Sequence, residues 1–153
     1  MKFKLILIPL VILELSIESF ADNISKVEWI TPSNRVCQSS GGKVDTLGCQ
    51  ATWEIAKNIC TNSGGKLPTI DILESVITNC GGKIIVDIFS EDGEKNEKNL
   101  SYQSCYKDKG FSPAFYWSAN RSYQLIDYVF FLQGVSGMGK GNINSHIRCI
   151  KNK

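Results

Sequence analysis

Six cysteines constrain this chain more than any other feature of its sequence. They are Cys37, Cys49, Cys60, Cys80, Cys105 and Cys149, in a chain of 153 residues. An even number of cysteines is typical of an exported protein, because cysteines pair in an oxidising compartment. We therefore expect three disulfides, although the spacing alone does not choose among the possible pairings.

Metal binding is the alternative to disulfides. No two cysteines have the C-x-x-C spacing of a zinc knuckle, and the single histidine of the chain is His146. Three carboxylates, Glu91, Asp92 and Glu94, lie close together, but lysines surround them as in a solvated surface segment. We expect no metal site and no cofactor.

The N-terminal residues 1–21 have the form of a secretory signal peptide. A short basic start precedes an apolar run over residues 5–13, and Ala21 ends a cleavage site of small residues. The uninterrupted run is shorter than the roughly 20 residues that cross a bilayer. We expect cleavage, export to the periplasm or the cell surface, and no membrane span afterwards. An uncleaved N-terminal anchor is the alternative.

Residues 22–153 have the size of one ordinary domain. Apolar residues make up 42% of the chain and charged residues 21%, a composition that favours a globular protein over a disordered one. The net charge of +2 gives no reason to expect a nucleic-acid partner. We divide this part into an N-terminal extension or hairpin, residues 22–48, and a main domain, residues 49–153.

Hydrophobic periodicity predicts two helices. Trp53, Ala56 and Cys60 fall on one face of a helix over residues 52–62, and a similar stripe predicts a second helix over residues 70–79. A Gly-Gly pair follows each helix, and we expect glycine to take the left-handed position that ends it.

Strands dominate the second half of the chain. Aromatic and β-branched residues predict strands over residues 27–30, 84–89, 115–118, 128–132 and 147–150. Residues 91–99 are polar and charged, and residues 134–141 are rich in glycine, so we expect loops in both segments. Helices followed by strands indicate an α+β fold with an antiparallel sheet.

Short motifs also occur in a particular order along the chain. They are Trp53-x-x-Ala56-x-x-x-Cys60, Gly64-Gly65-x-Leu67-Pro68-Thr69, Leu73, Tyr116-Trp117-Ser118, Gly134 and Ile147-Arg148-Cys149-Ile150. In this order they resemble the Lcl C-terminal domain family of bacterial exported proteins, over about residues 49–151. The resemblance implies a C-type lectin-like fold of the branch that includes formylglycine-generating enzymes. Such a fold has two helices packed on a small antiparallel sheet, with long irregular loops and disulfides.

The resemblance also implies one disulfide, Cys60–Cys149, from the first helix to the last strand. Proximity along the chain then leads us to expect Cys37–Cys49 and Cys80–Cys105. One departure from the family pattern concerns the start of the second helix. Ile72 stands where the family often has glutamate, so Thr69 cannot form a capping box there.

A non-enzymatic binding module, adhesin-like in character, is the function we expect. In lectin-like folds the late loops commonly carry recognition, so its partner would be a glycan, a matrix component or an envelope protein. Amide, aromatic and basic side chains suit such a ligand, and the candidates are Asn120, Arg121, Tyr123, Lys140, Asn142 and Asn144. We assign Tyr116 and Trp117 to the core.

Two other functions compete with this one. An enzyme or enzyme accessory of the formylglycine-generating branch would need a reactive cysteine pair and copper, which three disulfides would exclude. A structural, oligomeric subunit of a surface assembly is the other alternative.

Calcium binding is not expected, because Pro113 lacks the oxygen ligands that flank the proline of calcium-dependent lectins. Asn99 begins a glycosylation sequon, with Glu97 as an acidic residue before it.

Overall fold

The computed structural model describes residues 27–86 and 89–152 and has an α+β fold. The signal peptide expected over residues 1–21 lies outside the described residues. The described part contains five helices: α2 (Asn34–Ser39), α3 (Trp53–Asn62), α4 (Ile70–Asn79), α5 (Glu91–Lys98) and α6 (Leu100–Asp108). The sequence predicted two helices, and α3 and α4 confirm both; α2, α5 and α6 were missed.

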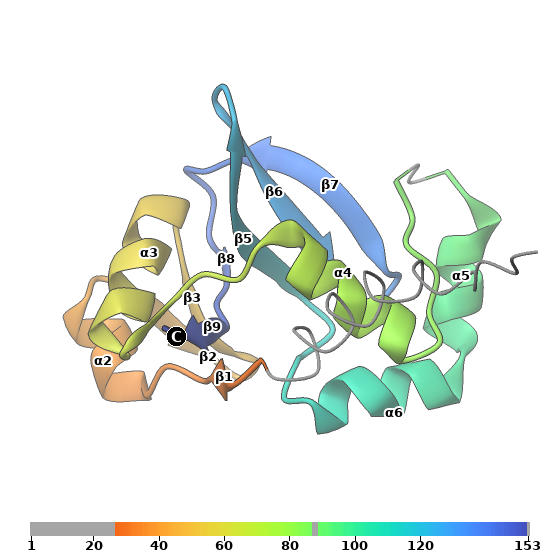
Figure 1. Ribbon diagram of the computed structural model, residues 1–153, viewed down its shortest axis with the longest axis horizontal. Coiled ribbons are helices and arrows are strands. Elements are labelled where there is room, and N and C mark those ends of the chain that lie inside the picture. Colours follow the sequence, from red (N-terminus) through yellow and green to blue (C-terminus); the bar gives the residue numbers. More distant parts are fainter. Residues whose placement is uncertain (1–26, 87–88, 153) are drawn as a thin grey trace, which may run out of the picture.

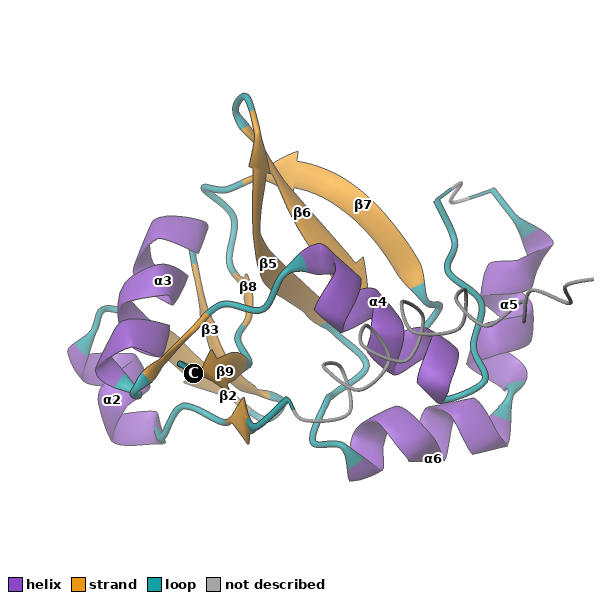
Figure 2. Ribbon diagram, viewed as in Figure 1, coloured by secondary structure: helices purple, strands orange, loops and turns teal. Residues whose placement is uncertain are grey.

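The strands form two sheets (Figures 1 and 2). The smaller sheet has the order β1 (Trp29–Ile30), β9 (Cys149–Lys151) and β4 (Gly65–Lys66). The larger has the order β2 (Lys43–Asp45), β3 (Gly48–Ala51), β8 (Ser145–His146), β5 (Phe115–Ser122), β6 (Leu125–Phe130) and β7 (Val135–Lys140). Neighbouring strands are antiparallel except β5 and β8, which are parallel, so the larger sheet is mixed.

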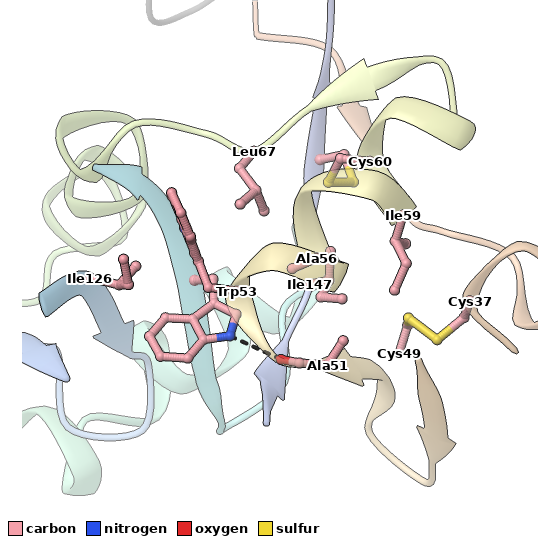
Figure 3. Packing of buried hydrophobic residues seen from close by; sticks show 12 residues of the cluster. Cys37, Cys49, Ala51, Trp53, Ala56, Ile59, Cys60, Leu67, Ile126 and Ile147 are labelled. Atoms are coloured by element: carbon pink, nitrogen blue, oxygen red, sulfur yellow. Dashed lines mark hydrogen bonds between the residues drawn. A yellow bond between two sulfur atoms is a disulfide. The ribbon is translucent and has the colours of Figure 1, made fainter. Parts of the chain in front are cut away.

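Two hydrophobic clusters lie on opposite faces of the larger sheet, and strand β5 contributes to both. Trp117 lies in the cluster under α3, which Figure 3 shows, whereas Tyr116 lies in the cluster under α4 and α6. Successive side chains of a strand point to opposite faces, so adjacent residues serve separate clusters. Both side chains are buried, as the sequence predicted.

All six cysteines lie in the described part of the chain and form three disulfides. The pairs are Cys37–Cys49, Cys60–Cys149 and Cys80–Cys105, the same three that we expected from the sequence. The first joins α2 to β3, the second α3 to β9, and the third the end of α4 to α6. Residues 27–48 supply β1 and β2, so they contribute a strand to each sheet.

The Gly-Gly pair after α3 shows why two glycines are needed. Gly64 has a φ of +84°, the left-handed conformation that ends the helix. Gly65 has no such φ, but a Cβ atom there would lie 2.3 Å from the backbone oxygen of Ile150 in β9. The first glycine therefore turns the chain, and the second allows β4 to approach β9 closely.

Two segments that we expected to be loops have regular structure. Residues 91–98 form α5, because the Ser90 side chain caps its start and the buried amide of Asn96 bonds to the backbone oxygens of Lys83 and Gln133. Residues 135–140 form β7, in which Gly137 and Gly139 leave room for the Tyr128 ring. Composition was misleading in both cases, because distant contacts decide the local structure.

Several strand predictions were also wrong in their limits. The strand expected over residues 84–89 is a single bridge from Ile85 to Val135, and residues 87–88 lie outside the described part. Strand β5 continues to Ser122 and β6 begins at Leu125. Of the strand expected over residues 147–150, only Cys149 and Ile150 lie in a strand, β9, and the short strand β8 comes just before this range. None of the described helices is long and apolar enough to cross a membrane.

Candidate ligand surface

Two of the predicted ligand residues, Arg121 and Tyr123, lie at the end of the β5–β6 hairpin, the uppermost point of Figure 1. Arg121 lies near the end of β5, and its Nε donates a hydrogen bond to the backbone oxygen of Tyr123. Tyr123 has a φ of +55° in the turn and is 98% exposed. Lys140 is exposed at the end of β7, opposite Leu125, the first residue of β6.

The loop after β7 carries two more of the predicted residues. Asn142 and Asn144 are exposed, and they lie between β7 and β8. The backbone oxygen of Gly141 accepts a hydrogen bond from the Trp53 N–H, which ties the start of this loop to α3. The loop therefore runs beside the first turn of α3.

Trp53 holds this part of the molecule together. Its indole Nε1 donates to the backbone oxygen of Ser118 in β5 at 2.8 Å, so the buried ring is fixed between α3 and the sheet. The Nζ of Lys57 lies 4.0 Å from the ring centroid, and the Cζ of Arg121 lies 5.8 Å from it. Both cations are within the range of a cation–π interaction with the same indole.

Glu54 is the carboxylate that these two cations share. Its carboxylate is 2.6 Å from the Lys57 Nζ and 4.0 Å from an Arg121 nitrogen. Two positive charges beside one negative charge leave an excess positive charge at Trp53. We call the following residues of this region the cation surface: Lys57, which is half-exposed, and Arg121, Tyr123, Asn142 and Asn144, which are exposed. Lys140 is not included, because it pairs with Leu125 whereas Arg121 pairs with Ile126, so the Lys140 side chain lies on the other face of the sheet.

Sequence reasoning did not name Lys57, and it placed Asn120 among the ligand candidates. Lys57 follows Trp53 by one helical turn, a spacing that places the two side chains together and could have identified it. Asn120 is half-buried, and its Oδ1 accepts a hydrogen bond from the Ile70 N–H at the start of α4. Asn120 is thus committed to the fold and is not part of the cation surface.

A second surface is aromatic. Phe115 is 44% exposed and stacks on Phe130 with ring centroids 4.4 Å apart, and neither belongs to the two hydrophobic clusters. Tyr128 packs at right angles to Phe115 and lies over Gly137. Tyr128 and Phe130 lie on the same face of β6 and are only half-buried.

His146 is buried and bonds to one carboxylate. Its Nε2 lies 3.2 Å from Asp45, which also accepts hydrogen bonds from the backbone N–H groups of Leu47 and Gly48. Burial acts to raise the pKa of Asp45, but the hydrogen bonds from His146 and the two backbone groups outweigh it, and the pKa lies below its ordinary value. These bonds fasten the β2–β3 hairpin to β8.

Two other sites were considered from the sequence, the carboxylates around Asp92 and the sequon at Asn99, and residues in both make contacts within the fold. Asp92 forms ion pairs with Lys83 and Lys95, and in the described residues no three His, Cys, Asp or Glu side chains gather as metal ligands. Asn99 is exposed at the N-cap of α6, where its Oδ1 accepts from the Tyr102 N–H. Glycosylation at Asn99 stays a prediction.

Comparison with known proteins found no relative of this chain. The chain matches no family model, no curated protein and no solved structure.

Proposed function

We propose that this protein is an exported, non-enzymatic binding module that recognises an acidic glycan through the cation surface. One observation carries the proposal: Lys57 and Arg121 face the same indole, Trp53, and share one carboxylate. The planar guanidinium of Arg121 suits a sulfate or carboxylate group. The exposed ring of Tyr123 and the amides of the loop suit the apolar face and hydroxyls of a sugar.

We further propose a lectin-like fold related to the Lcl C-terminal domain family. Support comes from the Cys60–Cys149 disulfide, which joins α3 to the last strand, and from the packing of α3 and α4 on the larger sheet. The mixed sheet and the additional helices α5 and α6 go beyond the simple arrangement that the resemblance implies.

An array of sulfated, carboxylated and neutral glycans tests the function. We expect binding to acidic members, at least a tenfold loss for Arg121→Ala, and a smaller loss for Arg121→Lys, which keeps the charge but not the planar fork. Lys98→Ala is the matched control, because Lys98 is an exposed lysine on α5 that pairs with Glu94. Binding to neutral glycans alone, or full binding by Arg121→Ala, would contradict the proposal.

The enzyme alternative requires free thiols. All six cysteines are paired, so none offers a thiolate for the cysteine chemistry of the formylglycine-generating branch. Titration of the native protein with a thiol reagent should give no reaction. Two reactive thiols per chain would restore the enzyme as the better proposal.

A further inference from the structure

A cleft lies between the start of β1, one side of α4 and the end of α6. Its volume is about 410 Å³, within the range of small-molecule sites. Its walls include Val27, Trp29, Ile72, Val76, Asn79 and Lys109. None of these residues belongs to the cation surface, so the cleft is a separate feature and does not depend on the function proposed above.

The apolar walls of the cleft come from α4 and β1. Ile72, Val76 and Asn79 lie about one turn apart on α4, so they share one side of the helix. The adjoining side of α4 carries Leu73 and Ile77, which are fully buried, and Val76 belongs to the same hydrophobic cluster. Trp29 faces the cleft from β1, and its ring is held edge-on by Phe111 with centroids 5.0 Å apart.

The polar side chains that line the cleft are Lys109, Asn79, Ser75 and the indole of Trp29, and the Ser75 hydroxyl already donates to the backbone oxygen of Ile72. Among the described residues, the amine of Lys109 has no ion-pair partner, and neither the Asn79 amide nor the indole N–H of Trp29 has a hydrogen bond. The described lining contains no carboxylate, and the nearby Glu28 is paired with Lys151 at 3.0 Å. The cleft therefore offers a positive charge and N–H donors without a matching acid.

A second positive charge lies behind the wall of the cleft. The Arg148 guanidinium packs on Trp29 and Phe111, and it donates to the Thr31 hydroxyl and to the backbone oxygen of Lys109. Arg148 is 8% exposed, its Nε has no hydrogen-bond partner, and no carboxylate in the described part of the chain pairs with it. A buried cation without a counter-charge favours an anion nearby.

We propose that this cleft binds an organic anion with an apolar body, such as a medium-chain carboxylate. The chain of the ligand lies against Trp29, Ile72 and Val76, and its carboxylate meets Lys109 and Asn79. The occupant follows from charge complementarity: cations line and back the cleft, and its described walls hold no acid.

Decanoate is a suitable probe, and Trp29 reports its binding. Trp53 and Trp117 are buried and donate their indole N–H groups to backbone oxygens, so a fluorescence change on adding decanoate comes chiefly from Trp29. We expect saturable binding of decanoate and at least tenfold weaker binding of decanol, which has the same chain without the charge.

Variants test the assigned residues. Lys109→Met should weaken decanoate binding about tenfold, and Asn79→Asp should weaken it through repulsion, while Lys98→Met on α5 serves as the control and leaves binding unchanged. Equal affinity for decanol, or no loss in both cleft variants, would overturn the proposal. A further variant, Ile24→Ser, tests whether the chain segment before Val27 fills the cleft. If decanoate binds Ile24→Ser but not the unchanged protein, the cleft belongs to that segment and the proposal is overturned.

Discussion

Asn120 caps helix α4 from a distant strand: its Oδ1 accepts a 2.8 Å hydrogen bond from the backbone N–H of Ile70. The N-cap residue of this helix is Thr69, whose own side chain makes no capping hydrogen bond. Ile72 at the third helical position has no oxygen to complete a capping box. A side chain of β5 thus takes the capping role that usually belongs to a residue next to the helix in sequence.

Replacing Asn120 should therefore change stability and leave ligand binding intact. We expect Asn120→Ala to lower the free energy of unfolding by about 1 kcal/mol, the usual contribution of a capping side chain. Thr69→Ala should have a much smaller effect. Urea unfolding measures both, and Asn120→Asp, which keeps an acceptor, is the control. A loss of glycan binding in folded Asn120→Ala would instead place Asn120 on the cation surface.

Local signals explain which helices were predictable. The apolar stripes of α3 and α4 and the glycines after them are all near neighbours in sequence, so periodicity identifies both helices. Apart from Gly93, every residue of helix α5 is polar, and the helix is anchored by hydrogen bonds from the buried Asn96 amide to the backbone oxygens of Lys83 and Gln133. No pattern within residues 91–98 indicates those distant partners.

The sequence likewise predicted only part of the candidate site: it indicated exposed residues but not the contacts between distant segments. Arg121, Tyr123 and Lys140 stand near glycines and turn residues, where exposure is common, and the structure places all three at one end of the sheet. The meeting of Arg121 with Trp53 depends on the packing of α3 against β5, sixty-odd residues apart in sequence. Such a contact cannot be read from spacing.

Removing the Glu54 carboxylate should strengthen the binding of an acidic glycan to the cation surface. Glu54→Gln leaves Lys57 and Arg121 without their negative partner, so we expect roughly two- to fivefold tighter binding of an acidic glycan, as befits an exposed ion pair. Binding at two salt concentrations measures the effect, which should shrink at higher salt. Glu94→Gln on α5, paired with Lys98, is the control, and an equal gain there would show a general charge effect.

The two glycines after α3 should differ in their tolerance of alanine. Gly64→Ala places a side chain at a φ of +84° with open space around it, so we expect a loss of about 1 kcal/mol in unfolding free energy. Gly65→Ala drives a Cβ against the Ile150 backbone oxygen, and we expect a loss of roughly 3 kcal/mol because backbone must move. Thermal unfolding ranks the two; the reverse order would mean that β4 and β9 separate easily.

The disulfides should differ in how much they contribute to the free energy of unfolding, according to the length of chain that each one closes. On the chain-entropy model, the 89-residue separation of Cys60–Cys149 corresponds to about 4.6 kcal/mol and the 12-residue separation of Cys37–Cys49 to about 2.8 kcal/mol. We expect the Cys60→Ala/Cys149→Ala double variant to be the less stable in denaturant. A larger loss for the Cys37→Ala/Cys49→Ala variant would show that Cys37–Cys49 stabilises mainly through native packing.

Acid should weaken the attachment of the β2–β3 hairpin through Asp45. The pKa of Asp45 in the folded protein lies below its ordinary value, so its contribution to stability is present above about pH 4 and is lost as the pH falls through the folded pKa. We expect the difference in unfolding free energy between the protein and Asp45→Asn to be largest near neutral pH and to vanish in strong acid. Denaturant unfolding across this range measures it. Asp108→Asn, at an exposed position on α6, is the control; the same pH dependence in both variants would remove Asp45 as its cause.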